Sequence, residues 1–299
     1  MKIMYNFVVS YLFERINIMV YIFYNPKSGN KNGKEIAEEL SRKINSEASV
    51  EDITAFNNKS DFFESLSEQD TILICGGDGT LNRFINTHVC EKIKADISYC
   101  PLGSGNDFAN DIELKSDSAP ISIKKYLTGL PTVEVKGKKY RFLDNVGFGI
   151  DGYCCEIGDI QKAKNKKAVN YTTIAIRGVL FDFKPRKATV TVDGITKCYS
   201  RVWLAPTLKG RYFGGGMMAT PSQNRLDEQK KLSILIFHDS GKIRLLSIFP
   251  KIFTGTHVKH KKYVEIIEGH EITVSFDRPT PLQIDGETIL GVTTYTARA

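Results

Sequence analysis

Ile72-Leu73-Ile74-Cys75-Gly76-Gly77-Asp78-Gly79-Thr80-Leu81-Asn82 is the most informative segment of this chain. An apolar strand runs directly into glycines, an acid and a hydroxyl group, and a helix is expected to follow. Glycine lets the backbone turn sharply and approach a ligand closely, and the amides of such a loop hold phosphate oxygens. Asp78 would repel phosphate unless a cation lies between them, so the loop predicts a metal–nucleotide site. The alternative is a bare strand–turn–helix with a capping aspartate, because short glycine motifs also occur by chance.

Two other segments have the same form, with glycine and hydroxyl groups following a strand. Phe23-Tyr24-Asn25-Pro26-Lys27-Ser28-Gly29 ends a strand expected at 19–25, and Tyr99-Cys100-Pro101-Leu102-Gly103-Ser104-Gly105-Asn106-Asp107-Phe108 ends one expected at 97–100. The carboxyl ends of parallel strands meet at one edge of their sheet, where open α/β sheets bind ligands. The three loops therefore predict one nucleotide site.

The first part of the chain alternates between strands and helices. The helix expected at 34–44 places Ile36, Leu40 and Ile44 on one face, which is the spacing of an amphipathic helix. Such alternation predicts a parallel sheet covered by helices. The expected strands are 19–25, 50–55, 71–75 and 97–100, and the expected helices are 34–44, 60–67 and 80–89.

From residue 131 onward, strands and turns dominate. Hairpins are expected across Lys136-Gly137-Lys138 and Asp193-Gly194, because Asp-Gly is a favoured hairpin turn. Two helices are expected near 170–181 and 241–253, and strands at 231–237, 264–268, 272–276, 281–284 and 290–296. We therefore expect an N-terminal extension (1–18), a nucleotide-binding α/β domain with a parallel sheet (19–130), and a β-rich, sandwich-like domain (131–299) whose last residues could return to the first domain.

The composition is that of a globular protein with a basic surface. The chain has 299 residues, a net charge of +7 and a pI near 8.9, which suits an anionic membrane, nucleic acid or phosphate ligands. No nucleic-acid motif accompanies the charge, so we expect no nucleic-acid partner. Six cysteines without CxxC or metal-ligand spacing favour a reducing, cytoplasmic setting. The apolar start is interrupted by Glu14 and Arg15, so it is not expected to span a membrane.

Motifs in a fixed order cover nearly the whole chain from about Met19. They are Asn25-Pro26-Lys27-Ser28-Gly29, Gly76-Gly77-Asp78-Gly79-Thr80, Pro101-Leu102-Gly103-Ser104-Gly105-Asn106-Asp107, Phe213-Gly214-Gly215-Gly216 with Pro221, and Leu282-Gln283-Ile284-Asp285-Gly286-Glu287. This set resembles the soluble bacterial lipid kinases related to diacylglycerol kinase catalytic domains and sphingosine kinases. The resemblance implies the two-domain fold of NAD kinases and diacylglycerol kinases, with ATP and Mg²⁺ as cofactors.

The resemblance also assigns residues to the nucleotide and to a catalytic magnesium. Asp78, Asp107 and Glu134 are the implied magnesium ligands, of which Asp78 is the leading one and Glu134 has a solvated strand end as its alternative. Arg83 stands where the family usually has glutamate, and it either bonds phosphate or faces solvent. The implied nucleotide contacts are Asn25, Ser28, Thr54, Gly76, Gly77, Asp78, Gly79, Thr80, Leu81, Asn82, Gly103, Ser104, Asn106 and Asp107.

Asp285 is implied as the general base for the lipid hydroxyl, with Glu287 assisting or orienting it. A carboxylate near Mg²⁺ and a primary hydroxyl can accept the proton directly or through water, whereas a plain Asp-Gly turn is the alternative. A second, structural magnesium site is implied at Asn224, Asp227 and Gln229. The turn there is one residue longer than in relatives and ends in two lysines, so a solvated turn is equally consistent with the sequence.

We therefore expect an ATP- and Mg²⁺-dependent lipid kinase that phosphorylates a hydroxyl of a diacylglycerol-like or long-chain-base lipid at a membrane surface. Apolar residues in 146–150 and 174–183 are candidates for acyl-chain contacts, and Lys162 to Lys167 for contacts with anionic head groups. The alternatives are an NAD kinase, whose later asparagine–glutamate pair is not found, and a degenerate nucleotide-binding regulator. The expected location is cytoplasmic with peripheral membrane association, and a homodimer is left open.

Overall fold

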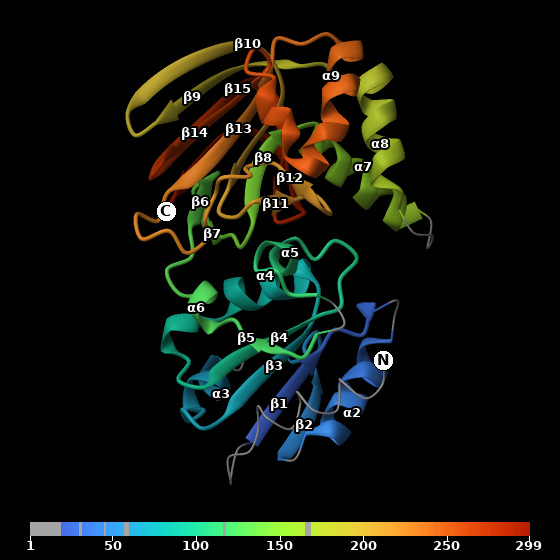
Figure 1. The fold of residues 1–299 in the computed structure, drawn as a ribbon, viewed down its shortest axis with the longest axis vertical. Coiled ribbons are helices and arrows are strands. Elements are labelled where there is room, and N and C mark those ends of the chain that lie inside the picture. The colour runs from blue at the N-terminus through green and yellow to red at the C-terminus, as the bar shows by residue number, and fades with distance from the viewer. Residues whose placement is uncertain (1–18, 30–31, 45, 57–59, 116–117, 165–168) are drawn as a thin grey trace. The chain divides into compact units, whose positions relative to one another are not determined.

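The computed structural model describes residues 19–29, 32–44, 46–56, 60–115, 118–164 and 169–299. The expected extension of residues 1–18 lies outside these ranges. The chain divides into two compact units, Met1–Leu130 and Pro131–Ala299 (Figure 1). Within the described ranges, no helix is both long enough and apolar enough to cross a bilayer.

The first unit is built on a five-stranded sheet in the order β2-β1-β3-β4-β5. The first four strands are parallel, and β5 adds an antiparallel edge. The strand order reverses between β1 and β3, because the chain leaves β1 for β2 on one side and continues with β3 on the other. Open α/β sheets bind ligands beside such a switch point. The strands are β1 (Met19–Tyr24), β2 (Glu47–Asp52), β3 (Thr71–Gly76), β4 (Asp96–Pro101) and β5 (Ile121–Ser122).

Helices cover both faces of this sheet (Figure 1). Ile22 of β1 packs in one cluster with Leu40 of α2, whereas Phe23 faces the other way and its ring lies 5.1 Å from that of Phe63 in α3. All residues of β3 are buried, as in a parallel sheet covered on both faces. The helical segments are α2 (Gly33–Lys43), α3 (Ser60–Ser65), α4 (Asp78–Thr87), η2 (Cys90–Lys92), α5 (Asp107–Asp111) and α6 (Lys124–Leu127).

The second unit is a nine-stranded antiparallel sheet that closes on itself. Its longest strands, β10 and β15, shift register part-way along, so that one half of each pairs with β9 and the other half with β8. The four strands thereby form a ring, which gives the unit its sandwich-like form. The strands of the second unit are β6 (Thr132–Val135), β7 (Lys138–Arg141), β8 (Asn145–Gly149), β9 (Arg186–Val192), β10 (Ile195–Leu208), β13 (Leu232–His238), β14 (Val264–Gly269), β15 (Glu271–Ile284) and β16 (Glu287–Arg298), with a separate pair β11 (Tyr212–Phe213) and β12 (Met217–Met218).

The helices of the second unit gather on one side of its sheet (Figure 1). Their inner residues, such as Ile174 and Leu245, share a core with Trp203 of β10. A separate core that includes Phe148, Val190 and Val274 joins the strands of the ring. The helical segments are α7 (Ile150–Lys164), α8 (Tyr171–Arg177), η3 (Gly178–Asp182), α9 (Lys242–Ile248), η4 (Phe249–Thr254) and η5 (Thr256–Lys259).

The predicted fold class, an α/β unit with a mostly parallel sheet followed by a β-rich unit, is confirmed. Helix α7, however, was not predicted. Its buried residues are Ile150, Gly152, Cys154 and Gly158, and two of these are glycines, so the sequence carries only a weak amphipathic signal.

Two expectations about strands also differ from the structure. The strands expected at 272–276 and 281–284 are one continuous strand, β15. The strand expected at 50–55 is β2, which ends at Asp52 because the Asp52 side chain accepts the Thr54 amide and turns the backbone. The last strand, β16, pairs with β15 and β6, which belong to the second unit.

Candidate active site

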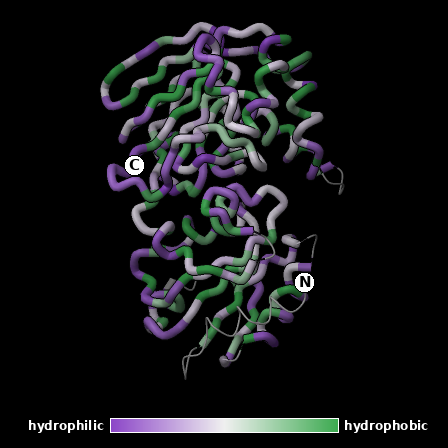
Figure 2. Tube along the Cα trace, in the orientation of Figure 1, coloured by the Kyte–Doolittle hydropathy of each residue, from purple (hydrophilic) through white to green (hydrophobic). Residues whose placement is uncertain are grey.

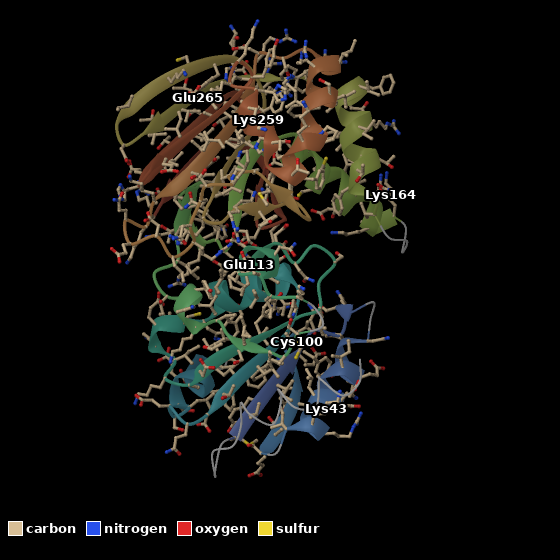
Figure 3. The ribbon with its side chains drawn as sticks, in the orientation of Figure 1. Lys43, Cys100, Glu113, Lys164, Lys259 and Glu265 are labelled. Carbon is tan, nitrogen blue, oxygen red and sulfur yellow. The ribbon has the colours of Figure 1, made fainter. Side chains whose placement is uncertain are left out.

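Three predicted loops meet at the carboxyl edge of the first unit's sheet. The Asn25 side chain, after β1, donates a 3.0 Å hydrogen bond to the Thr80 hydroxyl, after β3. The Leu102 amide, after β4, donates to the Gly76 carbonyl at 2.7 Å and its carbonyl accepts from the Gly29 amide at 2.8 Å. Cys100, labelled in Figure 3, lies one residue before the end of β4. The structure therefore brings the three loops together at the switch point of the sheet.

Glycines make this close approach possible. A Cβ added to Gly77 would lie 2.8 Å from the Gly103 Cα, and one added to Gly76 would lie 2.5 Å from the Thr80 hydroxyl oxygen. Gly79, in the first turn of α4, is different because a Cβ there would meet nothing within 4 Å. Its backbone is thus open to an approaching ligand at the N-terminus of a helix, where amides attract phosphate.

Asp78 joins two loops. Its two carboxylate oxygens accept the amides of Asp107 at 3.0 Å and Phe108 at 3.3 Å, which begin helix α5. Asn106 precedes that helix with a left-handed φ of 50°, and its side chain accepts the Gly103 amide at 2.8 Å. Asp78 therefore fixes the β4 loop against the β3 loop, and Asp107 is buried beside it.

The other residues predicted to lie near the nucleotide differ in their exposure to solvent. Ser104 is exposed and Ser28 is partly exposed in their loops, where both hydroxyls could contact a ligand. Leu81 is fully buried in the core, so only its backbone could contact nucleotide, and Asn82 is also buried. The Thr54 hydroxyl donates to Asp52 at the end of β2, and Arg83 is exposed on α4.

In the second unit, Asp285 holds a neighbouring loop. It forms a two-residue hairpin turn with Gly286 between β15 and β16, with φ values of 45° and 89°, as in a type I′ turn. One carboxylate oxygen accepts the amides of Asp144 at 2.9 Å and Asn145 at 2.8 Å, and the other accepts that of Leu143 at 2.6 Å. The predicted alternative, an Asp-Gly turn, thus describes the backbone, while the carboxylate fixes residues 143–145. Glu287, the next residue in the strand, is exposed.

A buried ion pair supports the same loop. Arg225 donates to the Asp144 carboxylate at 2.6 Å, and both side chains are 4% exposed. The other terminal nitrogen of Arg225 donates to the Leu143 carbonyl at 2.5 Å. Breaking such a buried pair from one side costs roughly 3–5 kcal/mol, so the pair anchors the loop that Asp285 binds.

Asp151 is a second acid in this unit; the residue as a whole is half-buried, and its carboxyl oxygen Oδ1 is enclosed. It lies in the first turn of α7, where one carboxylate oxygen accepts from Gln283 at 3.2 Å and the other is buried without a hydrogen-bond partner among the described residues. Burial raises the pKa of Asp151 to about 6. Gln283 also accepts the Gly286 amide at 2.9 Å, so one side chain connects Asp151 to the turn that carries Asp285.

These two units match two known domains in the same order. Residues 19–132 match the diacylglycerol kinase catalytic domain, and residues 144–298 match the YegS C-terminal NAD kinase beta sandwich-like domain. The chain belongs to the diacylglycerol kinase family. The family resemblance drawn from the sequence motifs is therefore confirmed.

Relatives of similar length share little sequence with this family member. YtlR of Bacillus subtilis, named as a candidate lipid kinase, is 22% identical over 92% of this chain and 94% of its own length. A protein of Staphylococcus epidermidis with the same description is 24% identical over 89% of both chains. A crystal structure from Bacillus anthracis, described as a candidate diacylglycerol kinase, superposes with a TM-score of 0.65 at 17% identity over 94% of this chain and 91% of that one. At this identity the superposition shows the shared fold.

The implied family metal ligands of the second unit have other partners. The Glu134 carboxylate pairs with Arg298 at 3.2 Å. The Asn224 side chain accepts the Leu226 amide, and the Gln229 carbonyl accepts from His270. Among the described residues, no group of three or more His, Cys, Asp or Glu residues is arranged to hold a metal.

Cations also surround Asp227. Lys209 is buried near Asp227. Burial lowers the pKa of Lys209, and the charge of Arg225 lowers it further, whereas the charge of Asp227 raises it; the net shift is downward. Lys230, which follows Asp227 in the same turn, adds a further positive charge. These ammonium groups oppose a divalent cation at the turn, so the donor set fits the implied structural Mg²⁺ poorly.

Sequence reasoning missed Asp144, Arg225 and Asp151 as members of this polar network. Only Asp151 carried a usable signal, because Gly149-Ile150-Asp151-Gly152 repeats the pattern of an apolar strand followed by glycine and acid. The partners of Asp144 and Arg225 lie far along the chain, and no local pattern points to them.

We predict that Gly79→Ala weakens ATP binding about tenfold or more, because the added methyl occupies open space beside the amides of α4. The same change leaves the unit folded and stabilises it by roughly 0.5–1 kcal/mol, since alanine favours a helix over glycine. Equilibrium titration with ATP and Mg²⁺, together with thermal unfolding, measures both effects. Gly241→Ala is the matched control, because Gly241 precedes helix α9 and also faces open space. Unchanged ATP affinity in Gly79→Ala would count against a nucleotide at this loop.

Proposed function

We propose that this family member is an ATP- and Mg²⁺-dependent lipid kinase that phosphorylates a hydroxyl of a diacylglycerol-like or long-chain-base lipid. The observation that carries this is the meeting of three glycine loops at the switch point of the first unit, held together by Asp78 and Asn25. Kinases of this family need a cradle for the triphosphate, cations to screen it and a group that accepts the proton of the acceptor.

The first unit is proposed to bind the nucleotide. Amides at Gly77 and Gly79 are proposed for phosphate oxygens, whereas the Gly103 amide is bonded to Asn106. The Ser28 and Ser104 hydroxyls lie in two of the three loops. Asp78 and Asp107 would hold Mg²⁺, because carboxylate oxygens are the ligands that this hard cation prefers. When bound, the ion neutralises charge on the triphosphate.

The second unit is proposed to bind the lipid and to accept the proton of its hydroxyl. Asp285 is the assigned acceptor, because it occupies the Asp-Gly-Glu position that the family resemblance implies for the base. Its two oxygens accept three amide bonds, which hold the carboxylate in one orientation. Glu287, exposed beside it, is available to orient the acceptor.

The direct test is ATP consumption by purified protein with a panel of lipids in mixed micelles. We expect a phosphorylated product from a diacylglycerol or a long-chain base, identified by mass spectrometry, and none without Mg²⁺. ATP affinity measured with and without Mg²⁺ gives a readout that is independent of turnover. Phosphorylation of NAD⁺ in place of lipid would assign the chain to the alternative activity, and binding of ATP without turnover of any acceptor would favour a regulator.

A further inference from the structure

Two neighbouring helical segments of the second unit expose large apolar side chains to solvent. Ile176, Leu180 and Phe181 of α8 and η3 are 47%, 36% and 75% exposed, and Ile243 of α9 is 87% exposed. Lys242, next to Ile243, donates a 2.6 Å hydrogen bond to the Leu180 carbonyl, so the two segments lie side by side. We call these four residues the docking patch. Single exposed apolar residues are common, but four on adjoining helices are a surface feature.

The local backbone forces these side chains outward. Val179 and Phe183 face the core, and between them the chain makes a π-helical turn in which the Phe183 amide donates to the Gly178 carbonyl at 2.7 Å. Such a turn adds one residue to the helix, and it often occurs at functional sites. Asp182 accepts from Tyr153 at 3.1 Å and pairs with Arg177, which fixes the turn with Phe181 in solvent.

Positive charge surrounds the docking patch. Residues 171–187 and 241–263, which contain α8, η3, α9, η4 and η5, carry ten Lys and Arg residues and one Asp. Their net charge of +9 exceeds the +7 of the whole chain, so the rest of the protein is slightly acidic. Lys259, labelled in Figure 3, belongs to this group. Figure 2 shows hydrophobic and hydrophilic residues side by side along these helices.

We propose that this face of the second unit docks on an anionic lipid bilayer, with the docking patch entering the interface and the lysines and arginines contacting acidic head groups. This inference rests on the proposed function, because a lipid acceptor must be withdrawn from a bilayer. Interfacial binding combines apolar insertion with attraction to anionic lipid, which is the combination found here. Nucleic acid would use the cations alone, since exposed Phe181 and Ile243 side chains gain nothing from a phosphate backbone.

The apolar part is tested by sedimentation with vesicles of phosphatidylcholine containing phosphatidylglycerol, without nucleotide. We expect Phe181→Ala/Ile243→Ala to weaken vesicle binding roughly tenfold or more, because two large apolar side chains no longer leave water. The matched control is Ile195→Ala, since Ile195 is 78% exposed on the β9–β10 turn and lies outside the patch. Unchanged binding of the double variant, or an equal loss in the control, would overturn the proposal.

The electrostatic part is tested with Lys184→Gln and Arg244→Gln, two exposed cations of the same segments. Each change is expected to weaken binding roughly fivefold at low salt, and added salt should reduce this difference because it screens the charges. Vesicles of phosphatidylcholine alone should bind weakly to every variant. Equal affinity for neutral and anionic vesicles would also overturn the proposal. So would binding to a DNA duplex that is stronger than binding to vesicles and is the same for wild type and Phe181→Ala/Ile243→Ala.

Activity separates this inference from the proposed function. Ile243→Ala, Lys184→Gln and Arg244→Gln lie outside the candidate acyl-chain residues, so with a short-chain acceptor dispersed in water these variants should turn over at the wild-type rate. With the same acceptor class in vesicles, they should lose most of their activity. Vesicle binding by a protein that phosphorylates no lipid would refute the kinase and leave the docking surface standing. If substitutions in the docking patch leave turnover in vesicles unchanged, the docking surface is refuted and the kinase activity stands.

Discussion

Asp285→Asn is expected to lower the turnover of lipid phosphorylation about 100-fold or more while ATP affinity stays unchanged. An amide cannot accept the proton of the acceptor hydroxyl, and a general base contributes roughly 100- to 10,000-fold to a rate. Steady-state kinetics in mixed micelles and equilibrium ATP binding measure the two quantities separately.

The same substitution also has a structural effect that must be separated from catalysis. The oxygen of asparagine can keep the bonds from Asp144 and Asn145, but its amino group would face the Leu143 amide, donor against donor. Leaving that amide without an acceptor costs roughly 1–3 kcal/mol of folding free energy. Urea unfolding of the variant should show this loss.

Asp193→Asn provides a control from the same chain. Asp193 also begins an Asp-Gly turn, with a φ of 46°, and its carboxylate accepts the amides of His270 and Glu271. These bonds lower the pKa of Asp193, so this turn has the same architecture without a proposed catalytic role. We expect Asp193→Asn to keep turnover within about twofold. Similar turnover in both variants would show that Asp285 acts only as a structural tie.

Local patterns predicted the first unit well because its contacts are close in sequence or follow from strand order. The apolar run from Ile72 to Cys75 is a fully buried strand, and glycine follows it where the backbone must approach Gly103. Once the sheet is parallel, the ends of β1, β3 and β4 must meet. The position of the three loops was therefore predictable from their order alone.

Contacts between distant segments could not be predicted in the same way. The Asp78 carboxylate accepts the amides that begin α5, a helix 29 residues later, and no local pattern predicted that contact. Asp285 reaches amides more than 140 residues earlier in the chain, and Arg225 reaches Asp144 over 81 residues. Such pairings depend on how strands close into the ring of the second unit, and no local spacing encodes that closure.

Asp151→Asn is expected to stabilise the protein by up to about 3 kcal/mol near pH 8 and by less than about 1 kcal/mol near pH 4. Burial raises the pKa of Asp151 from 3.8 to about 6, so the folded state holds a proton that the unfolded state has released between these values. Stability is therefore greatest below the unfolded pKa and falls as pH rises toward 6, after which the cost stays constant. Urea unfolding of both proteins across this pH range measures the difference, which asparagine should remove because it carries no charge.

Asp159→Asn is the matched control, because Asp159 lies on the same helix with its side chain 49% exposed and its replacement should change stability by no more than about 0.5 kcal/mol. An equal gain in both variants would mean that net charge, not burial of Asp151, sets the effect. A buried acid with an unpartnered oxygen lowers stability, and such groups cluster at functional sites because their charge is used there. We therefore expect Asp151→Asn to be more stable and less active than wild type. If Asp151→Asn is more stable at pH 8 but keeps full turnover, Asp151 is not part of the candidate site.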